Sequence, residues 1–192
     1  MVLDYEQAIR KALGEGRPPR LYLDANVILD ALRPERRQAS LELVRESHAQ
    51  RCECVSSYFA AIEALDKEQE NAWARQKIRS KHKFEWIVRR RRLRDLKPQT
   101  LTRIANEFFG QLLGAPLSAV TWVTVDKDVW EDTISLAATT NVNAPDCIHI
   151  ATAMAYECDV LVTDDQGLLG LAQEHIAATD SEHVLKTLQE AH

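Results

Sequence analysis

The sequence predicts an α/β protein of three layers, with helices on both faces of a central parallel sheet of about five strands. Two observations predict this class. Short apolar runs alternate with segments of helical periodicity, and acidic residues follow several of those runs. Strands that alternate with helices are typical of parallel sheets, in which each helix crosses from one strand to the next. A chain of 192 residues is long enough to bury a sizeable core in one such domain.

The expected elements follow from these runs. The predicted strands are residues 20–24, 52–55, 120–125, 160–162 and 175–178. The predicted helices lie around them, at residues 4–13, 35–49, 101–113, 146–158 and 180–188, with two more beginning after Ser57 and at Asp128. Ser56 or Ser57 is a suitable N-cap, and Asp128 with Glu131 has the spacing of a capping box.

The chain divides into a short extension and one main domain. Residues 1–19 are expected to form a helical extension, because Gly14 and Gly16 end a periodic segment and Pro18-Pro19 breaks the chain before the first strand. Residues 20–192 form the main domain. A charged segment at about 69–97 interrupts its pattern and is predicted to be a basic helical insertion.

Charge is distributed unevenly. The net charge is −5, but residues 75–97 hold 11 Lys or Arg and two acids, so this segment is cationic and the rest strongly acidic. Such a local cationic surface can bind phosphate groups, and Trp86 could stack on a base. The alternatives are a solvated helix face and a docking site for an acidic partner. The residues expected to contact the phosphate groups are Arg89, Arg90, Arg91, Arg92, Arg94 and Lys97.

Composition otherwise indicates an ordinary globular protein. No apolar stretch approaches the roughly 18 residues that cross a membrane, and the first ten residues lack the apolar core of a signal peptide. We therefore expect a cytoplasmic protein without a membrane partner. The four cysteines lack the paired spacing of a zinc ribbon, so we expect buried, reduced thiols.

Acidic residues occur where a parallel sheet would bring its strand ends together. Asp24 closes the first predicted strand, and Asp164 and Asp165 follow the fourth. Glu63 interrupts an apolar run, and Asp146 begins a helical pattern. Ligands of open α/β sheets bind beyond the carboxyl ends of the strands, and gathered carboxylates there favour a hard divalent cation.

Each acid also has a structural interpretation. Asp24 is suited to cap a helix, and Asp146 in a first helical turn would complement the helix dipole. Glu63 is either a glutamate at the rim of an amphipathic helix or a functional group, as a metal ligand or as a base whose pKa is raised without a metal.

Residues 23–30, the helical Glu63, residues 144–153 and residues 161–165, in this order and spacing, resemble the PIN-domain nuclease family, which includes the VapC-type ribonuclease toxins. The resemblance implies an endoribonuclease in which Mg²⁺ or Mn²⁺ activates water. The metal ligands and catalytic residues that it implies are Asp24, Glu63, Asp146 and Asp165.

The resemblance also implies roles for neighbouring residues. Asn26 and Thr163 would order the site through hydrogen bonds. The family pattern Thr-x-Asp corresponds to Thr163 and Asp165, so Asp165 is preferred as the ligand, with Asp164 as its neighbour or alternative. His149 is expected to be a packed structural residue.

The implied partners are RNA, a cognate antitoxin that blocks the cleft and a second copy of the chain, since dimers are common among such toxins. The basic insertion departs from compact toxins. A non-catalytic RNA- or protein-binding module on the same fold is the main alternative. A phosphatase with an aspartyl nucleophile would need an acid at Asn26, and a structure-specific DNA nuclease would need a DNA-binding element that the sequence does not display.

Overall fold

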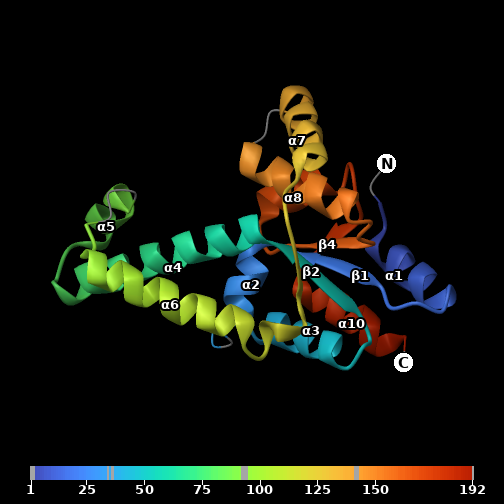
Figure 1. The fold of residues 1–192 in the computed structure, drawn as a ribbon, viewed down its shortest axis with the longest axis horizontal. Coiled ribbons are helices and arrows are strands. Elements are labelled where there is room, and N and C mark those ends of the chain that lie inside the picture. Colours follow the sequence, from blue (N-terminus) through green and yellow to red (C-terminus); the bar gives the residue numbers. More distant parts are fainter. Residues whose placement is uncertain (1–2, 34, 36, 92–94, 141–142, 192) are drawn as a thin grey trace.

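The computed structural model describes residues 3–33, 35, 37–91, 95–140 and 143–191. Its centre is a five-stranded sheet of order β3-β2-β1-β4-β5, and every neighbouring pair is parallel (Figure 1). This confirms the predicted fold class. The strands are β1 (Arg20–Leu23), β2 (Glu53–Ser57), β3 (Thr121–Val123), β4 (Val160–Val162) and β5 (Ala178–Thr179). The predicted strand at residues 175–178 was wrong at its start, because His175 lies in a turn and β5 begins at Ala178.

Helices connect and flank these strands. The helices are α1 (Tyr5–Gly14), α2 (Ala25–Ala31), α3 (Gln38–His48), α4 (Tyr58–Arg79), α5 (Phe84–Arg90), α6 (Pro98–Leu113), α7 (Lys127–Thr139), α8 (Ala144–Ala155), α9 (Gln166–Ala172) and α10 (Ser181–Glu190), with a 3-10 turn at Leu117–Ala119.

Two hydrophobic clusters cover the two faces of the sheet, because successive strand residues point to opposite sides. Leu21 and Leu23 of β1 pack in one cluster with apolar residues of α1, α2, α3, α4, α6 and α10. Tyr22, between them, packs in the other with Ile150 of α8 and Leu168 of α9. The sheet therefore lies between two helical layers, as predicted.

Each strand ends at, or is shortly followed by, a polar residue that caps the next helix. Asp24, Ser57, Asp126, Asp165 and Asp180 each accept a hydrogen bond from a backbone N–H in the first turn of α2, α4, α7, α9 and α10. The cap of α7 is Asp126, which the sequence also favours as a helix cap, and not the capping box predicted at Asp128. Because β1 lies between β2 and β4, this pattern brings Asp24, Ser57 and Asp165 to adjacent positions at one edge of the sheet.

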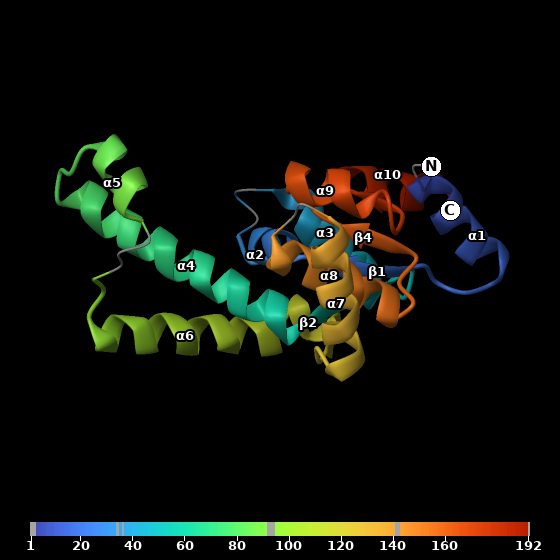
Figure 2. The ribbon, with the colours of Figure 1, turned by 90° about the horizontal axis from the view of Figure 1, so that it is seen from above.

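Helices α4, α5 and α6 form an arm that extends away from the sheet (Figures 1 and 2). Helix α4 is continuous over 22 residues, so the expected start of an insertion near residue 69 falls inside one helix. The arm has a small core of its own, made by Trp73, Ile87, Leu96 and Ile104. No helix in the described ranges is both long enough and apolar enough to span a membrane.

The four cysteines, Cys52, Cys54, Cys147 and Cys158, are all buried and free, as predicted. Burial raises the pKa of the Cys158 thiol to about 12. A thiol that is buried and protonated is a poor nucleophile and a poor metal ligand, so Cys158 contributes packing.

Asp159, just before β4, fastens the amino end of the sheet to the segment that follows α1. Its carboxylate accepts two hydrogen bonds of 2.7 Å from the guanidinium of Arg17 and another of 2.7 Å from the Arg20 amide. Burial by itself would raise the pKa of Asp159, but the hydrogen bonds from Arg17 and Arg20 and the charge of Arg17 outweigh it and lower that pKa.

An Asp159→Asn variant is expected to lower the free energy of unfolding by about 1–2 kcal/mol at pH 7, since Arg17 is partly exposed and the pair is screened. A group whose pKa is lowered on folding stabilises the protein above its unfolded pKa of about 4, and this contribution is lost as the pH falls through its folded pKa. The difference in urea midpoint between the variant and the natural chain should therefore shrink below about pH 4. Glu15→Gln, which removes the exposed partner of the same arginine, is the control and should change stability by less than about 0.5 kcal/mol.

Candidate functional site

A pocket of about 120 Å³ lies beyond the carboxyl ends of β1 and β4. A larger cavity of about 580 Å³ lies at the opposite, amino ends of β4 and β5, but its acids Asp4 and Asp159 are already engaged in a helix cap and in the Arg17 pair. The smaller pocket collects acids from four different segments. Its lining residues are Asp24, Ala25, Asn26, Glu63, Lys67, Asp146, His149, Asp165 and Leu168.

Asp24 is 2% exposed, and both of its oxygens accept hydrogen bonds. Oδ1 accepts from the Val27 amide at 2.9 Å, which caps α2, and Oδ2 accepts from the Thr163 hydroxyl at 2.5 Å. The structural and functional interpretations of Asp24 are therefore compatible. Burial raises the pKa of Asp24, although nearby His149 and these two hydrogen bonds act in the opposite direction.

Thr163 joins two acids of the pocket. Its buried hydroxyl donates to Asp24 and accepts from the Asp165 amide at 3.0 Å. Asp165 Oδ1 accepts from the amides of Gly167 and Leu168, which caps α9. Thr163 thus fixes the backbone that carries Asp165 relative to the carboxylate of Asp24.

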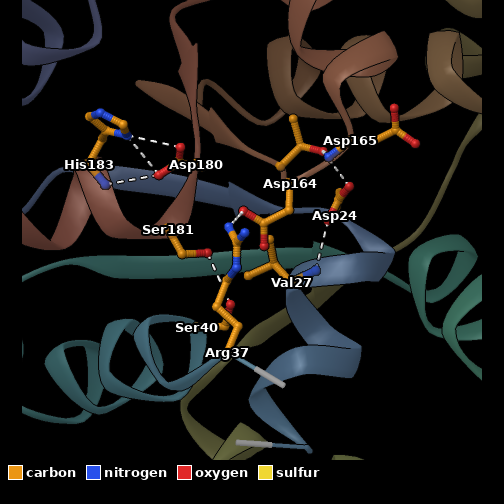
Figure 3. A network of polar contacts seen from close by, with 10 residues as sticks. Asp24, Val27, Arg37, Ser40, Asp164, Asp165, Asp180, Ser181 and His183 are labelled. Carbon is orange, nitrogen blue, oxygen red and sulfur yellow. Dashed lines mark hydrogen bonds and ion pairs between the residues drawn. The ribbon is translucent and has the colours of Figure 1, made fainter. Parts of the chain in front are cut away.

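Asp164 points away from the pocket and pairs with Arg37, while the carboxylate of Asp165 lies on the other side of the chain (Figure 3). Burial raises the pKa of Asp164 to about 6, although the charge of Arg37 lowers it. Of the two acids that the sequence left in competition, only Asp165 lines the pocket in the described structure.

Glu63 is held by a buried chain of hydrogen bonds. Its Oε2 lies 2.7 Å from His149 Nε2, and His149 Nδ1 lies 2.9 Å from the hydroxyl of Tyr22. That hydroxyl lies 2.9 Å from the Ser57 hydroxyl, which also caps α4. His149 is packed, as expected, but it also orients an acid of the pocket. The sequence feature that could have indicated this role is the position of His149 three residues after Asp146, which places both residues on the same side of a helix.

Asp146 lies in the first turn of α8 and is half-buried. Burial raises its pKa, and the negative charges of Asp165 and Glu63 raise it further. Asn26, from the first turn of α2, lines the same pocket. Carboxylates that repel one another in this way are stabilised by a bound cation.

The oxygen donors of the pocket fit a hard divalent cation that keeps part of its water shell. Among the described residues, no three His, Cys, Asp or Glu side chains converge closely enough to surround one ion directly. Mg²⁺ keeps several of its waters when it binds to proteins, so one or two carboxylates suffice as direct ligands. The carboxylates around this pocket fit such an ion, with some of them acting through water.

The basic residues of the arm lie around α5. Arg89, Arg90 and Arg91 are exposed, and so is Lys97 at the start of α6. Arg92 and Arg94 lie outside the described residues. Arg91 Nε lies 3.6 Å from Glu70 of α4, so the end of α5 lies close to that helix.

Trp86, which was expected to be available to a base, is engaged within the arm. Its ring stacks on His82 with centroids 4.3 Å apart and on Trp73 at 6.2 Å. The guanidinium of Arg90 lies 5.1 Å from its centroid. The ring is therefore already part of a stack that supports the arm.

Residues 21–173 match the family model described as the PIN domain, and the chain therefore belongs to the PIN domain family. A comparison with curated proteins returned no match. The crystal structure of FitAcB from Neisseria gonorrhoeae is similar over 85% of this chain and 99% of that one, with a TM-score of 0.52 and 16% identity. A toxin–antitoxin complex from Klebsiella pneumoniae is similar over 84% and 97%, with a TM-score of 0.45 and 15% identity.

Proposed function

We propose that the protein is a Mg²⁺- or Mn²⁺-dependent endoribonuclease. The observation that carries this proposal is the pocket itself, in which Asp24, Glu63, Asp146 and Asp165 gather at one edge of the sheet. The hydrogen bonds of Thr163 and His149 hold two of these acids in fixed orientations. A non-catalytic binding module would have no need for acids that repel one another and are oriented in this way.

Each group of the pocket has a role in phosphodiester hydrolysis. A bound divalent ion would supply a water of lowered pKa and neutralise charge that develops on the phosphate. Asp24, Asp146 and Asp165 would hold that ion, directly or through its waters. Glu63, oriented by His149, would hold the ion or accept a proton from the attacking water.

The arm would bind the RNA backbone. Arg89, Arg90 and Arg91 are exposed cations on a protein whose net charge is −5, so they form a local site for phosphate groups. The ion pair of Arg91 with Glu70 keeps this run close to α4, the helix that also carries Glu63. An RNA strand bound along the arm would therefore be led toward the acidic pocket.

The direct test is incubation of the purified protein with structured and single-stranded RNAs in Mg²⁺, in Mn²⁺ and in EDTA. We expect cleavage with either metal and none in EDTA, with activity restored when metal is added back. Melting temperature is measured in parallel, because an ion that binds only the folded state stabilises it. Intact RNA together with no rise in melting temperature in Mn²⁺ would contradict the proposal and favour the binding module.

An Arg89→Ala, Arg90→Ala and Arg91→Ala triple variant is expected to bind RNA at least about tenfold more weakly at low salt. Its plot of log affinity against log salt should be shallower by about 2, since each phosphate contact with single-stranded RNA contributes about 0.7. Fluorescence anisotropy at several salt concentrations measures both quantities. Replacing Arg10, Lys11 and Lys186, exposed cations of α1 and α10, is the matched control. Equal slopes for both triple variants would leave the arm without a role in RNA binding.

We also propose, from the resemblance of the motifs to VapC-type toxins, that a cognate antitoxin blocks the pocket and that the protein pairs with a second copy. Co-expression with the adjacent reading frame tests the first point, since an antitoxin should co-purify and suppress cleavage. Size-exclusion chromatography with light scattering tests the second. A monomer of 21.8 kDa would contradict it.

A further inference from the structure

We propose that Lys67 binds a phosphate group of the substrate at the rim of the acidic pocket. The inference rests on the proposed function and deepens it, because it assigns a substrate contact within the same site. Lys67 is the single cation among the residues that line the pocket in the described structure.

The position of Lys67 is fixed by α4. The lysine lies four residues after Glu63, so the two side chains project from the same side of one continuous helix. Ser57 caps the start of this helix through the Ala60 amide, and Glu63 is tied to His149. The base of the Lys67 side chain is therefore held beside the pocket, while the residue itself is exposed and its ammonium can reach a ligand.

A structural role for Lys67 would be an ion pair along its own helix. A Glu followed four residues later by a Lys is the favourable arrangement for such a pair. The Oε2 atom of Glu63 instead bonds to His149 at 2.7 Å. In the described part of the chain, the ammonium of Lys67 makes no ion pair and no hydrogen bond. The lysine thus lines the pocket without a structural partner.

The charges around Lys67 indicate its ligand. The four carboxylates of the pocket leave it negative even after one divalent ion has bound, so a phosphodiester would be repelled. An ammonium at the rim offsets this repulsion, and lysine binds phosphate as a point charge that does not demand one orientation. Lys67 is not suited to help bind the metal ion, because a positively charged ammonium beside the pocket lowers the affinity of the pocket for a second cation.

The surroundings of Lys67 also connect the pocket to the arm. Glu70, three residues further along α4, pairs with Arg91 of the basic run at 3.6 Å. Lys67 therefore lies between the acids that would cleave the strand and the arginines that would bind it. An RNA strand that runs from the arm to the pocket would meet Arg91 at one end of this part of α4 and Lys67 at the other.

The experiment compares Lys67→Ala, Lys67→Arg and the control Lys186→Ala, each in an Asp146→Asn background so that RNA stays intact. Anisotropy with single-stranded RNAs of different sequence, in Mg²⁺, should show binding about tenfold weaker for Lys67→Ala, equally for all sequences. Lys67→Arg should stay within about twofold of its parent, and the control should not change. Calorimetry with Mn²⁺ uses chains that keep Asp146. It should show that the Mn²⁺ affinity of Lys67→Ala is equal to or higher than that of the natural chain.

RNA affinity of Lys67→Ala within twofold of its parent would overturn the inference. A loss of Mn²⁺ binding in Lys67→Ala would also overturn it, because the lysine would then support the pocket rather than the substrate. Cleavage by the natural chain is measured separately. Its absence in Mg²⁺ and Mn²⁺ would contradict the nuclease proposal, and RNA affinity would still show whether Lys67 contacts phosphate.

Discussion

An Asp146→Asn variant is expected to lose RNA cleavage by about 100-fold or more and to keep its fold. The substitution preserves the size of the side chain but removes one negative charge from a pocket proposed to hold a divalent ion. The rise in melting temperature that Mn²⁺ should produce in the natural chain is expected to shrink or vanish in the variant. Initial cleavage rates and melting curves with and without Mn²⁺ measure the two effects.

The same variant should be at least as stable as the natural chain when no metal is present. The pKa of Asp146 is raised in the folded state by burial and by the charges of Asp165 and Glu63. A carboxyl whose pKa is raised on folding stabilises the protein when protonated, and this stability is lost as the pH rises through the folded pKa. At pH 7 the carboxylate is therefore unfavourable, and a neutral asparagine removes that cost.

Asp132→Asn is the matched control, because Asp132 is an exposed acid of α7 outside the pocket. It should leave cleavage, the response to Mn²⁺ and the metal-free melting temperature unchanged. An Asp146→Asn variant that cleaves RNA at the natural rate would remove Asp146 from the proposed mechanism. A variant that loses both activity and stability would indicate that Asp146 supports the fold.

The position of the acids could be predicted from the sequence because the geometry of a parallel sheet is simple. Every strand ends at the same edge, so an acid that directly follows an apolar run must lie there. Asp24 and Asp165 follow β1 and β4, which are neighbours in the sheet. Position after a strand could not by itself separate Asp164 from Asp165, and Asp165 was preferred only through the family pattern. Adjacent residues point in different directions, and the turn into α9 determines which one faces the pocket.

Side-chain contacts between segments far apart in the chain could not be predicted from the sequence. The bond of Glu63 to His149 joins residues 86 positions apart, and neither periodicity nor spacing reports on such a pair. A basic helical insertion was predicted at about 69–97, but the way the arm packs could not be predicted, for the same reason. Its core takes Trp73 from α4, Ile87 from α5, Leu96 from the segment before α6 and Ile104 from α6. It therefore depends on contacts between elements, which the periodicity of one helix does not reveal.

A Thr163→Val variant is expected to lower the free energy of unfolding by about 1–3 kcal/mol, because it leaves the buried carboxylate of Asp24 and the partly buried amide of Asp165 each without the partner that Thr163 supplies. Valine has nearly the shape of threonine, so packing is preserved while the hydroxyl is lost. Asp24 Oδ2 then loses its donor at 2.5 Å and the Asp165 amide loses its acceptor at 3.0 Å. Urea denaturation at pH 7 measures the loss.

The variant should also cleave RNA about 10- to 100-fold more slowly, since groups that orient metal ligands have effects of this size. Thr163→Ser keeps the hydroxyl and should restore most of the stability and activity. Thr133→Val is the matched control, because the buried hydroxyl of Thr133 donates only to the Val129 carbonyl within its own helix. If Thr163→Val and Thr133→Val have equal effects on stability and neither alters cleavage, the hydroxyl of Thr163 does not couple Asp24 to Asp165. A deficit in Thr163→Val that serine repairs would show instead that one hydroxyl maintains the relative positions of two acids that the chain separates by 141 residues.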